Sequence, residues 1–219
     1  MRISNKNFKY VQDTNLKKYQ YMDSWCFEYS KFLRNEVNNT KSSRRKTYKK
    51  YAKGTIVYAK LGINIGREFS GNHFCMVLNK SDSVNNPILT VIPLTSSSTR
   101  FNIKINEGIL QLATNILDKQ AKILANKVLL TAENIIESGD PSLVKTGKQL
   151  ERETEELIKV CERYERYRST DTYANVLNIT SISKDRITKM NDYDPSGEMT
   201  YSEETIKRID ESIKNRFLN

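Results

Sequence analysis

The stretch "GTIVYAKLGINIGREFSGNHFCMVLNK", residues 54–80, decides the fold, because the apolar pattern changes there from helical to strand-like. Two short runs rich in β-branched and aromatic residues flank a loop, 61–72, that contains three glycines. The runs "ILTVIPLTS" (88–96) and "FNIKI" (101–105) have the same character. Together the four runs predict a small, strongly bent antiparallel sheet or barrel.

Helical patterns lie on both sides of this region. Residues 16–37 place apolar side chains three and four positions apart, which predicts an amphipathic helix that packs on the rest of the protein. From about 107 to 167 the helical period returns, interrupted by the turn-forming "SGDPS" at 138–142. This pattern predicts a hairpin of two long helices.

The last part of the chain is mixed. "YANVLNITSI" at 173–182 has the strand pattern again, and "SKDRITKM" after it is typical of a short helical turn. The helical pattern at 202–217 predicts a closing helix with Ser202 as its N-cap. The apolar face of this helix is formed by Ile206, Ile209, Ile213 and Phe217. The expected fold class is therefore α+β.

Composition argues against several classes of protein. A chain of 219 residues with 37% hydrophobic content suffices for one domain with an embellishment, or for two small domains. Charged residues interrupt every apolar run well before the ~20 residues of a membrane helix, and the N-terminus lacks the apolar part of a signal peptide. We therefore expect a cytoplasmic protein. The three cysteines, Cys26, Cys75 and Cys161, are far apart and the histidine is single, which argues against a disulfide framework, a metal site or a cofactor.

The net charge of +10 is concentrated in residues 1–53, which hold 14 basic residues and 4 acidic ones. Within them, "KSSRRKTYKKYAK" at 41–53 contains no acid and interleaves two tyrosines with its cations. Cations neutralise phosphates and aromatic rings stack on unpaired bases, so this segment favours single-stranded nucleic acid as a partner. A solvated linker and a surface for an acidic protein are the alternatives. The candidate phosphate-binding residues are Arg44, Arg45, Lys46, Lys49 and Lys50.

Several short motifs occur in one order along the chain. "GTIVYAKLG" is similar to an opening strand "GDVYWADL", and "GREFSGNHFCMVLNKSD" is similar to "GxExxGxRPxxVxxND". "LTVIPLTSS" is similar to a strand that ends in a functional threonine, and "VLNITSISKDRITKM" is similar to "QIRTIDKxRL". By these motifs, roughly half of the chain resembles the MazF/PemK toxins, RNA-cleaving proteins of bacterial toxin–antitoxin pairs. The matching positions are Gly66, Glu68, Gly71, Val77, Asp82, Thr95, Ile182, Lys184, Arg186 and Ile187.

This resemblance implies a small SH3-like barrel, a homodimer, a cognate antitoxin, and metal-independent cleavage of single-stranded RNA. Residues 54–106 and 169–219 would then form the barrel and its C-terminal helix. Residues 1–53 would be a basic helical N-terminal extension, and residues 107–168 an inserted helical hairpin.

One departure from the family concerns the single histidine. Where the family commonly carries an arginine, this chain has His73, followed by Phe74 instead of proline. Cleavage of RNA without a metal needs one group that takes the 2′-hydroxyl proton and one that protonates the leaving 5′-oxygen. A histidine with a pKa of ~6.5 suits both tasks. Thr95 falls on the functional threonine of the family. We therefore expect both His73, for its proton chemistry, and Thr95, for its position in the family motif, to be catalytic.

Further groups near these two residues are candidates for binding RNA or stabilising the charge of the transition state. They are Arg67, Glu68, Ser96 and Ser97. The glycine-rich segment 61–72 predicts a flexible loop that could cover a polymer substrate, or an ordinary surface connection.

Structural roles are the alternatives for these side chains. His73 could cap a strand edge, Thr95 could satisfy a turn, and Arg67 could pair with its neighbour in the loop. Two other function classes also stay open. One is a non-catalytic nucleic-acid-binding regulator built on the barrel, and the other is a structural adaptor whose hairpin recruits a partner helix.

Overall fold

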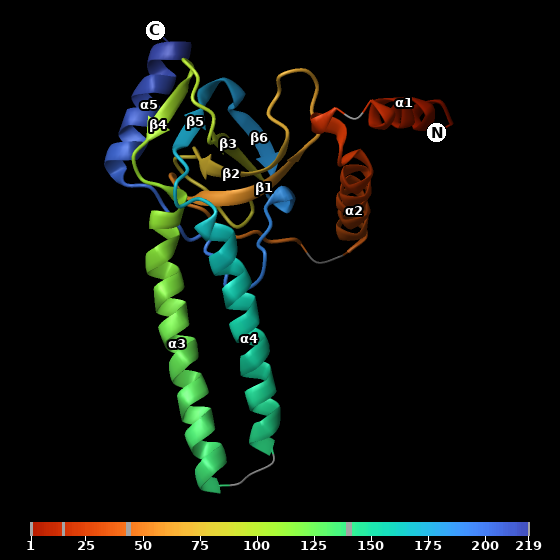
Figure 1. Ribbon diagram of the computed structural model, residues 1–219. Coiled ribbons are helices and arrows are strands. Elements are labelled where there is room, and N and C mark those ends of the chain that lie inside the picture. The colour runs from red at the N-terminus through yellow and green to blue at the C-terminus, as the bar shows by residue number, and fades with distance from the viewer. Residues whose placement is uncertain (1, 15, 43–44, 139–141, 219) are drawn as a thin grey trace.

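The computed structural model describes residues 2–14, 16–42, 45–138 and 142–218. Its centre is a six-stranded antiparallel sheet in the order β1-β2-β3-β5-β4, with β6 also paired to β3 (Figure 1). Helices surround this sheet, and the predicted α+β fold class is confirmed. The strands are β1 (Ile56–Gly62), β2 (Gly71–Val77), β3 (Ile88–Thr95), β4 (Asn102–Ile105), β5 (Thr172–Asn175) and β6 (Thr180–Ser183).

The segment expected to form a strand at 173–182 forms two strands. A short 3₁₀ helix, η2 (Val176–Asn178), separates β5 from β6. Leu94 of β3 pairs with Ala174 of β5, whereas Leu89 pairs with Ile182 of β6. β5 and β6 therefore pair with β3 in different registers, and the residues of η2 accommodate the difference.

The chain after β6 returns to β1 and closes the sheet into a small barrel. The expected helical turn is present as η3 (Lys184–Arg186). Directly after it, Ile187 forms a bridge with Ala59 of β1, and the Thr188 amide donates to the Tyr58 carbonyl at 2.9 Å. The path β1-β2-β3-β6 is thereby joined at its two ends.

Both faces of the strands are buried, because alternate side chains enter two different cores. Val57, Cys75 and Val91 belong to a small core inside the barrel. Ile56 and Met76 point the other way, into a larger core that also contains side chains of the long helices. The near-continuous apolar runs in the sequence follow from this burial on both faces.

A buried ion pair joins the two sequence blocks that resemble the MazF/PemK family. Nζ of Lys184 lies 2.6 Å from Oδ2 of Asp82, and the two side chains are 3% and 0% exposed. Burial by itself raises the pKa of Asp82, but hydrogen bonds from Lys184, the Tyr51 amide and Asn86 hold it below its ordinary value. The ionised carboxylate therefore links η3 to the loop between β2 and β3.

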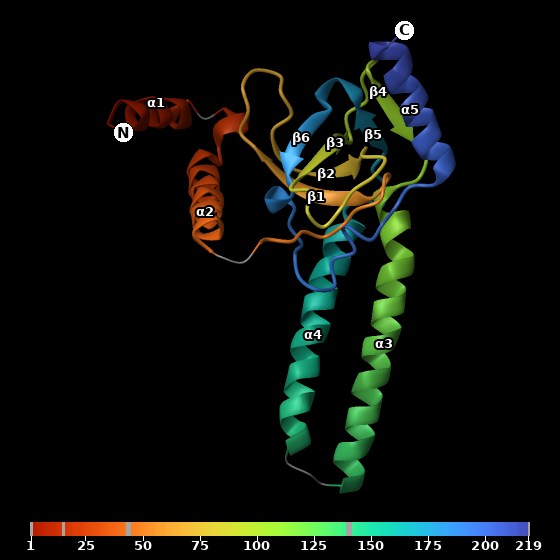
Figure 2. The ribbon, with the colours of Figure 1, turned by 180° about the vertical axis from the view of Figure 1, so that it is seen from behind.

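The N-terminal helices lie to one side of the barrel, away from the helical hairpin (Figures 1 and 2). They are α1 (Arg2–Asp13), the 3₁₀ helix η1 (Lys17–Tyr19) and α2 (Met22–Lys41). The prediction of one helix over 16–37 is wrong at its start, because a turn separates η1 from α2. Its expected packing is also incomplete. Met22 is buried, but Leu33 and Val37 are 46% and 51% exposed.

The predicted hairpin consists of α3 (Ile109–Ser138) and α4 (Ser142–Glu165), two long helices that project from the barrel (Figure 1). Of the turn expected at 138–142, residues 139–141 lie outside the described residues. At the barrel end, the buried carboxylate of Asp194 accepts hydrogen bonds from Arg163 at 2.9 Å and Tyr164 at 2.8 Å. These contacts hold the end of α4, and the residues that follow it, against the barrel.

The closing helix α5 (Glu203–Phe217) begins as predicted. The Ser202 hydroxyl accepts a hydrogen bond from the Thr205 amide at 3.3 Å, which confirms the N-cap. On the expected apolar face Ile209 is fully buried, whereas Phe217 is 52% exposed. The apolar face of α5 is therefore buried at Ile209 but exposed at its C-terminal end.

Candidate active site

His73 lies at the start of β2, where the backbone and one aromatic ring hold its imidazole. Nε2 lies 3.0 Å from the Ser70 carbonyl oxygen, and the Phe69 ring centroid lies 4.4 Å from the imidazole centroid. Gly71 has φ of +99°, and a Cβ there would lie 3.4 Å from Nε2. The positive φ favours glycine at this position, because other residues rarely adopt that backbone conformation.

The same surroundings set the charge of His73. Burial lowers its pKa below the ordinary value of 6.5, and the carbonyls of Ser70 and Leu94 oppose this shift in part because they favour the protonated ring. The imidazole is therefore neutral at pH 7. In the tautomer that donates Nε2–H to the Ser70 carbonyl, Nδ1 holds the lone pair.

Thr95 is the last residue of β3, at the end of the strand that lies beside the start of β2. Its backbone pairs with Tyr173 of β5, which fixes the strand end. The Thr95 hydroxyl oxygen accepts a hydrogen bond from the Ser97 amide at 3.1 Å. Because the oxygen is used as an acceptor, the hydroxyl hydrogen is free to donate to a ligand.

A cavity of ≈ 390 Å³ brings the two predicted catalytic residues together. His73 and Thr95 both line it, and so does Ser96, which was predicted to assist them. The same cavity is also lined by Arg166 and Tyr167, which directly follow α4. The residues that directly follow α4 thus supply part of the site that β2 and β3 begin.

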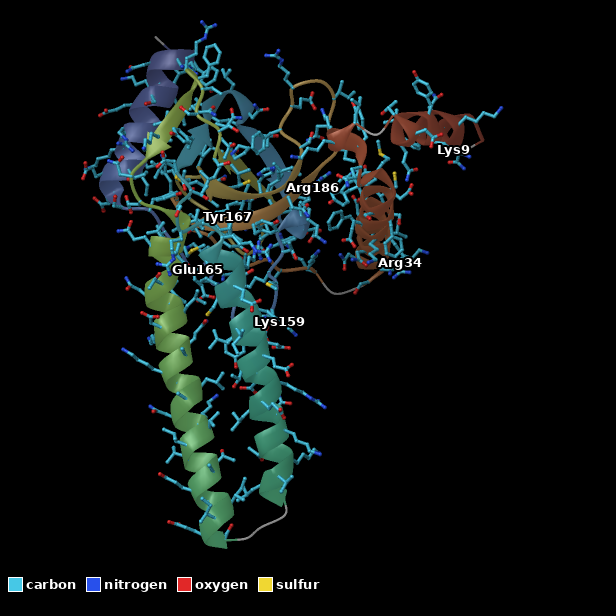
Figure 3. The ribbon with its side chains drawn as sticks, in the orientation of Figure 1. Lys9, Arg34, Lys159, Glu165, Tyr167 and Arg186 are labelled. Carbon is cyan, nitrogen blue, oxygen red and sulfur yellow. The ribbon has the colours of Figure 1, made fainter. Side chains whose placement is uncertain are left out.

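Arg166 and Tyr167 are site residues that were not predicted from the sequence. The Tyr167 ring packs edge-on against Phe74 of β2, with centroids 5.5 Å apart, and Figure 3 shows it where α4 meets the barrel. Burial first, and then the nearby Tyr58, raise the pKa of Tyr167, so its hydroxyl is protonated at neutral pH. Arg166 is exposed and has no ion pair among the residues that the structure describes. A signal was present in "ERYERYRST", 162–170, where cations and tyrosines end a helix.

Other predicted site residues lie elsewhere. Arg67 is exposed in the β1–β2 loop and does not line the His73 cavity, and neither does Ser97. Glu68 lines a different cavity, next to Arg186. The structure therefore does not bring these three predicted residues to the cavity.

The basic segment 41–53 follows the surface of the barrel over its described part. The Tyr48 amide donates to the Val84 carbonyl at 2.9 Å, and Lys184 donates to the Lys49 carbonyl at 3.0 Å. Lys46 forms an ion pair with Asp185. The alternative of a solvated linker is therefore wrong for residues 45–53.

None of the four predicted phosphate-binding residues that the structure describes in this segment lines the His73 cavity. Arg45, Lys49 and Lys50 are exposed, and Arg44 lies outside the described residues. Their role in binding RNA stays a prediction.

A comparison with known protein families relates part of this chain to one of them. Residues 52–138 match the family described as PemK-like, MazF-like toxin of type II toxin-antitoxin system. The match covers less than half of the chain, and over this segment the chain is similar to the PemK/MazF toxins. The match contains β1 to β4, and with them His73 and Thr95, and it continues through α3. Arg166, Tyr167 and the second resembling block at 176–190 lie beyond it.

A search of curated proteins gives no match. The PemK/MazF relationship itself implies a toxin with an antitoxin partner and an RNA substrate, and members of the family are usually endoribonucleases. No helix in the described part of the chain is long and apolar enough to cross a membrane.

Proposed function

We propose that this PemK/MazF toxin is an endoribonuclease that cleaves single-stranded RNA without a metal ion and is neutralised by a cognate antitoxin. One observation carries the proposal. A neutral histidine and a threonine with a free hydroxyl hydrogen line one cavity, at the positions where the family motifs place functional residues.

The first step would use Nδ1 of His73 as the base. It takes the proton of an RNA 2′-hydroxyl, and the 2′-oxygen then forms a bond to the adjacent phosphorus. The bond from phosphorus to the 5′-oxygen breaks, which leaves a 2′,3′-cyclic phosphate on one product and a 5′-hydroxyl on the other. DNA has no 2′-hydroxyl and would not be cut.

Charge builds up on the phosphate oxygens as the 2′-oxygen attacks. The Thr95 hydroxyl can donate a hydrogen bond to these oxygens, and the Arg166 guanidinium can supply positive charge. Arg166 would thus provide the cation that the family carries at the position of His73. The leaving 5′-oxygen can take its proton from Tyr167 or from solvent, because the Tyr167 hydroxyl is protonated at neutral pH.

The test is incubation of the purified protein with single-stranded RNA in EDTA, beside DNA of the same sequence. We expect cleavage of the RNA alone, with 2′,3′-cyclic phosphate and 5′-hydroxyl ends identified by mass spectrometry. Tight binding of RNA without cleavage would favour the non-catalytic regulator instead.

A further inference from the structure

A second, larger cavity lies on the other side of His73, between the N-terminal extension and the barrel. Its volume is ≈ 650 Å³, and it is lined on one side by η1 and α2 and on the other by β1, β2 and the loop between them. Asn72 and His73 line both this cavity and the candidate active site. A ligand that extends past His73 can therefore occupy both.

The cavity has a positive rim. Lys17, Lys18 and Lys60 line it, and Glu28 is the single carboxylate among the described lining residues. Lys60 is paired with Glu28 at 2.6 Å, and Lys18 donates to the Gly66 carbonyl at 2.6 Å. Lys17 is exposed and forms no ion pair within the described part of the chain. The rim therefore offers positive charge to a polyanion.

Two aromatic rings of the N-terminal extension complete the cavity. The Trp25 indole lies so close to Gly62 that a Cβ there would be 2.1 Å from it, and the Arg186 guanidinium lies 5.5 Å from the centroid of the ring. Figure 3 shows Arg186 on the side of the barrel that faces α2. The Tyr21 ring also lines the cavity and is 68% exposed. Trp25 is thus a fixed wall, while the Tyr21 ring is available to a ligand.

We propose that the N-terminal extension forms a nucleobase subsite, in which Tyr21 stacks on an unpaired base of single-stranded RNA next to the bond that is cut. The subsite rests on the proposed function. Lysines beside an exposed aromatic ring are the combination that binds single strands, because the cations hold phosphates while every base has a face that can stack. Continuity with the active site through His73 selects RNA over a protein partner for this surface.

The experiment compares Tyr21→Ala and Tyr21→Phe with a control, Tyr10→Ala. Tyr10 is 74% exposed on α1 and does not line the cavity. Binding is measured by fluorescence anisotropy with a mixed-sequence 2′-O-methyl RNA oligonucleotide, which cannot be cleaved. KM and kcat are measured with RNA that the wild-type protein cuts. Because Tyr21 is exposed, the thermal unfolding midpoint should not change.

We expect Tyr21→Ala to weaken binding about 5- to 100-fold and to raise KM while kcat stays within about twofold. Tyr21→Phe keeps the ring and should bind like the wild-type protein, as should Tyr10→Ala. Lys17→Ala should lower the slope of log affinity against log salt by about 0.7.

Two outcomes separate this subsite from the proposed function. If the wild-type protein cuts RNA and Tyr21→Ala binds and cuts it equally well, the subsite is overturned and this surface is left to a protein partner. If binding depends on Tyr21 but the wild-type protein cuts no RNA, the proposed function fails, and Tyr21 is left as a base-stacking residue of a protein that binds RNA without cutting it.

Discussion

His73 and Thr95 lie at the ends of two neighbouring antiparallel strands and line one cavity with Arg166, which directly follows α4. Two parts of the chain that are far apart in sequence therefore supply one site. This arrangement places a base, a hydrogen-bond donor and a cation around the same space. The predictions below address each of these groups and the structure that holds them.

Thr95→Ala should lower kcat/KM for RNA by about 10²-fold, because one donor to the developing charge is lost. Thr95→Ser keeps the hydroxyl and should retain most of the activity. Both changes lie at the rim of the barrel, so the thermal unfolding midpoint should stay close to that of the wild-type protein. Equal activity of Thr95→Ala and Thr95→Ser would show that the hydroxyl takes no part.

Arg166→Ala should reduce kcat by about 10²-fold, since the cavity loses its cation and the phosphorane is less stabilised. Lys159→Ala is the matched control, because Lys159 is an exposed cation on α4 that does not line the cavity (Figure 3). Steady-state kinetics of both variants decide the matter. A similar loss in the two variants would indicate a general effect of charge on RNA binding.

The pH dependence of cleavage follows from the lowered pKa of His73. A base must be neutral, so kcat/KM should rise with pH below about 6.5 and reach a plateau by pH 7. The residual kcat/KM of His73→Gln should not show this rise with pH. A rate that falls with rising pH over this range would mean that the protonated ring is the active form.

The lowered pKa of His73 also makes the free energy of unfolding depend on pH. The folded protein binds the His73 proton less readily than the unfolded chain, so the free energy of unfolding should fall as pH drops below the ordinary value of 6.5. His73→Gln should remove this part of the loss. Urea unfolding at several pH values between 7 and 5, on both proteins, measures the difference.

Asp82→Asn should lower the free energy of unfolding by about 3–5 kcal/mol, because it leaves the Lys184 ammonium buried without its counter-charge. Glu198→Gln is the control. It removes an exposed ion pair with Lys189 and should cost about 1 kcal/mol or less.

The lowered pKa of Asp82 determines how the stability contributed by this residue changes with pH. Its contribution to stability is present above the ordinary value of 3.8 and is lost as pH falls through the lower folded-state pKa. The difference between Asp82→Asn and the wild-type protein should therefore narrow in acid. Urea unfolding curves at pH 7 and in acid test both statements.

The sequence predicted the part of the site that strand patterns determine. The placement of His73 and Thr95 near one another follows from local signals, since each lies at the end of an apolar run and consecutive antiparallel strands meet at such ends. Their choice as catalytic candidates came from the resemblance to the MazF/PemK toxins. The split into β5 and β6 was not predictable, because it depends on how both strands pair with β3.

Arg166, Tyr167 and Tyr21 could not be placed from the sequence for a different reason. Their positions depend on where two helical segments dock on the barrel, and docking is set by long-range contacts such as those of Asp194 and Gly62. Periodicity gives the length of a helix but not the place where its end lies. The exposed Phe217 shows the same limit, since an apolar stripe does not say how much of it is covered.

The most direct test of the account is the rate of RNA cleavage by His73→Ala in EDTA, measured beside the wild-type protein at equal folded concentration. We predict a loss of about 10²–10⁴-fold with an unchanged circular dichroism spectrum. His73→Arg, which restores the residue common in the family, shows whether positive charge can replace proton transfer. Cleavage by His73→Ala at the wild-type rate would contradict the account, and would leave His73 as a packed ring beside Phe69 and not a catalytic base.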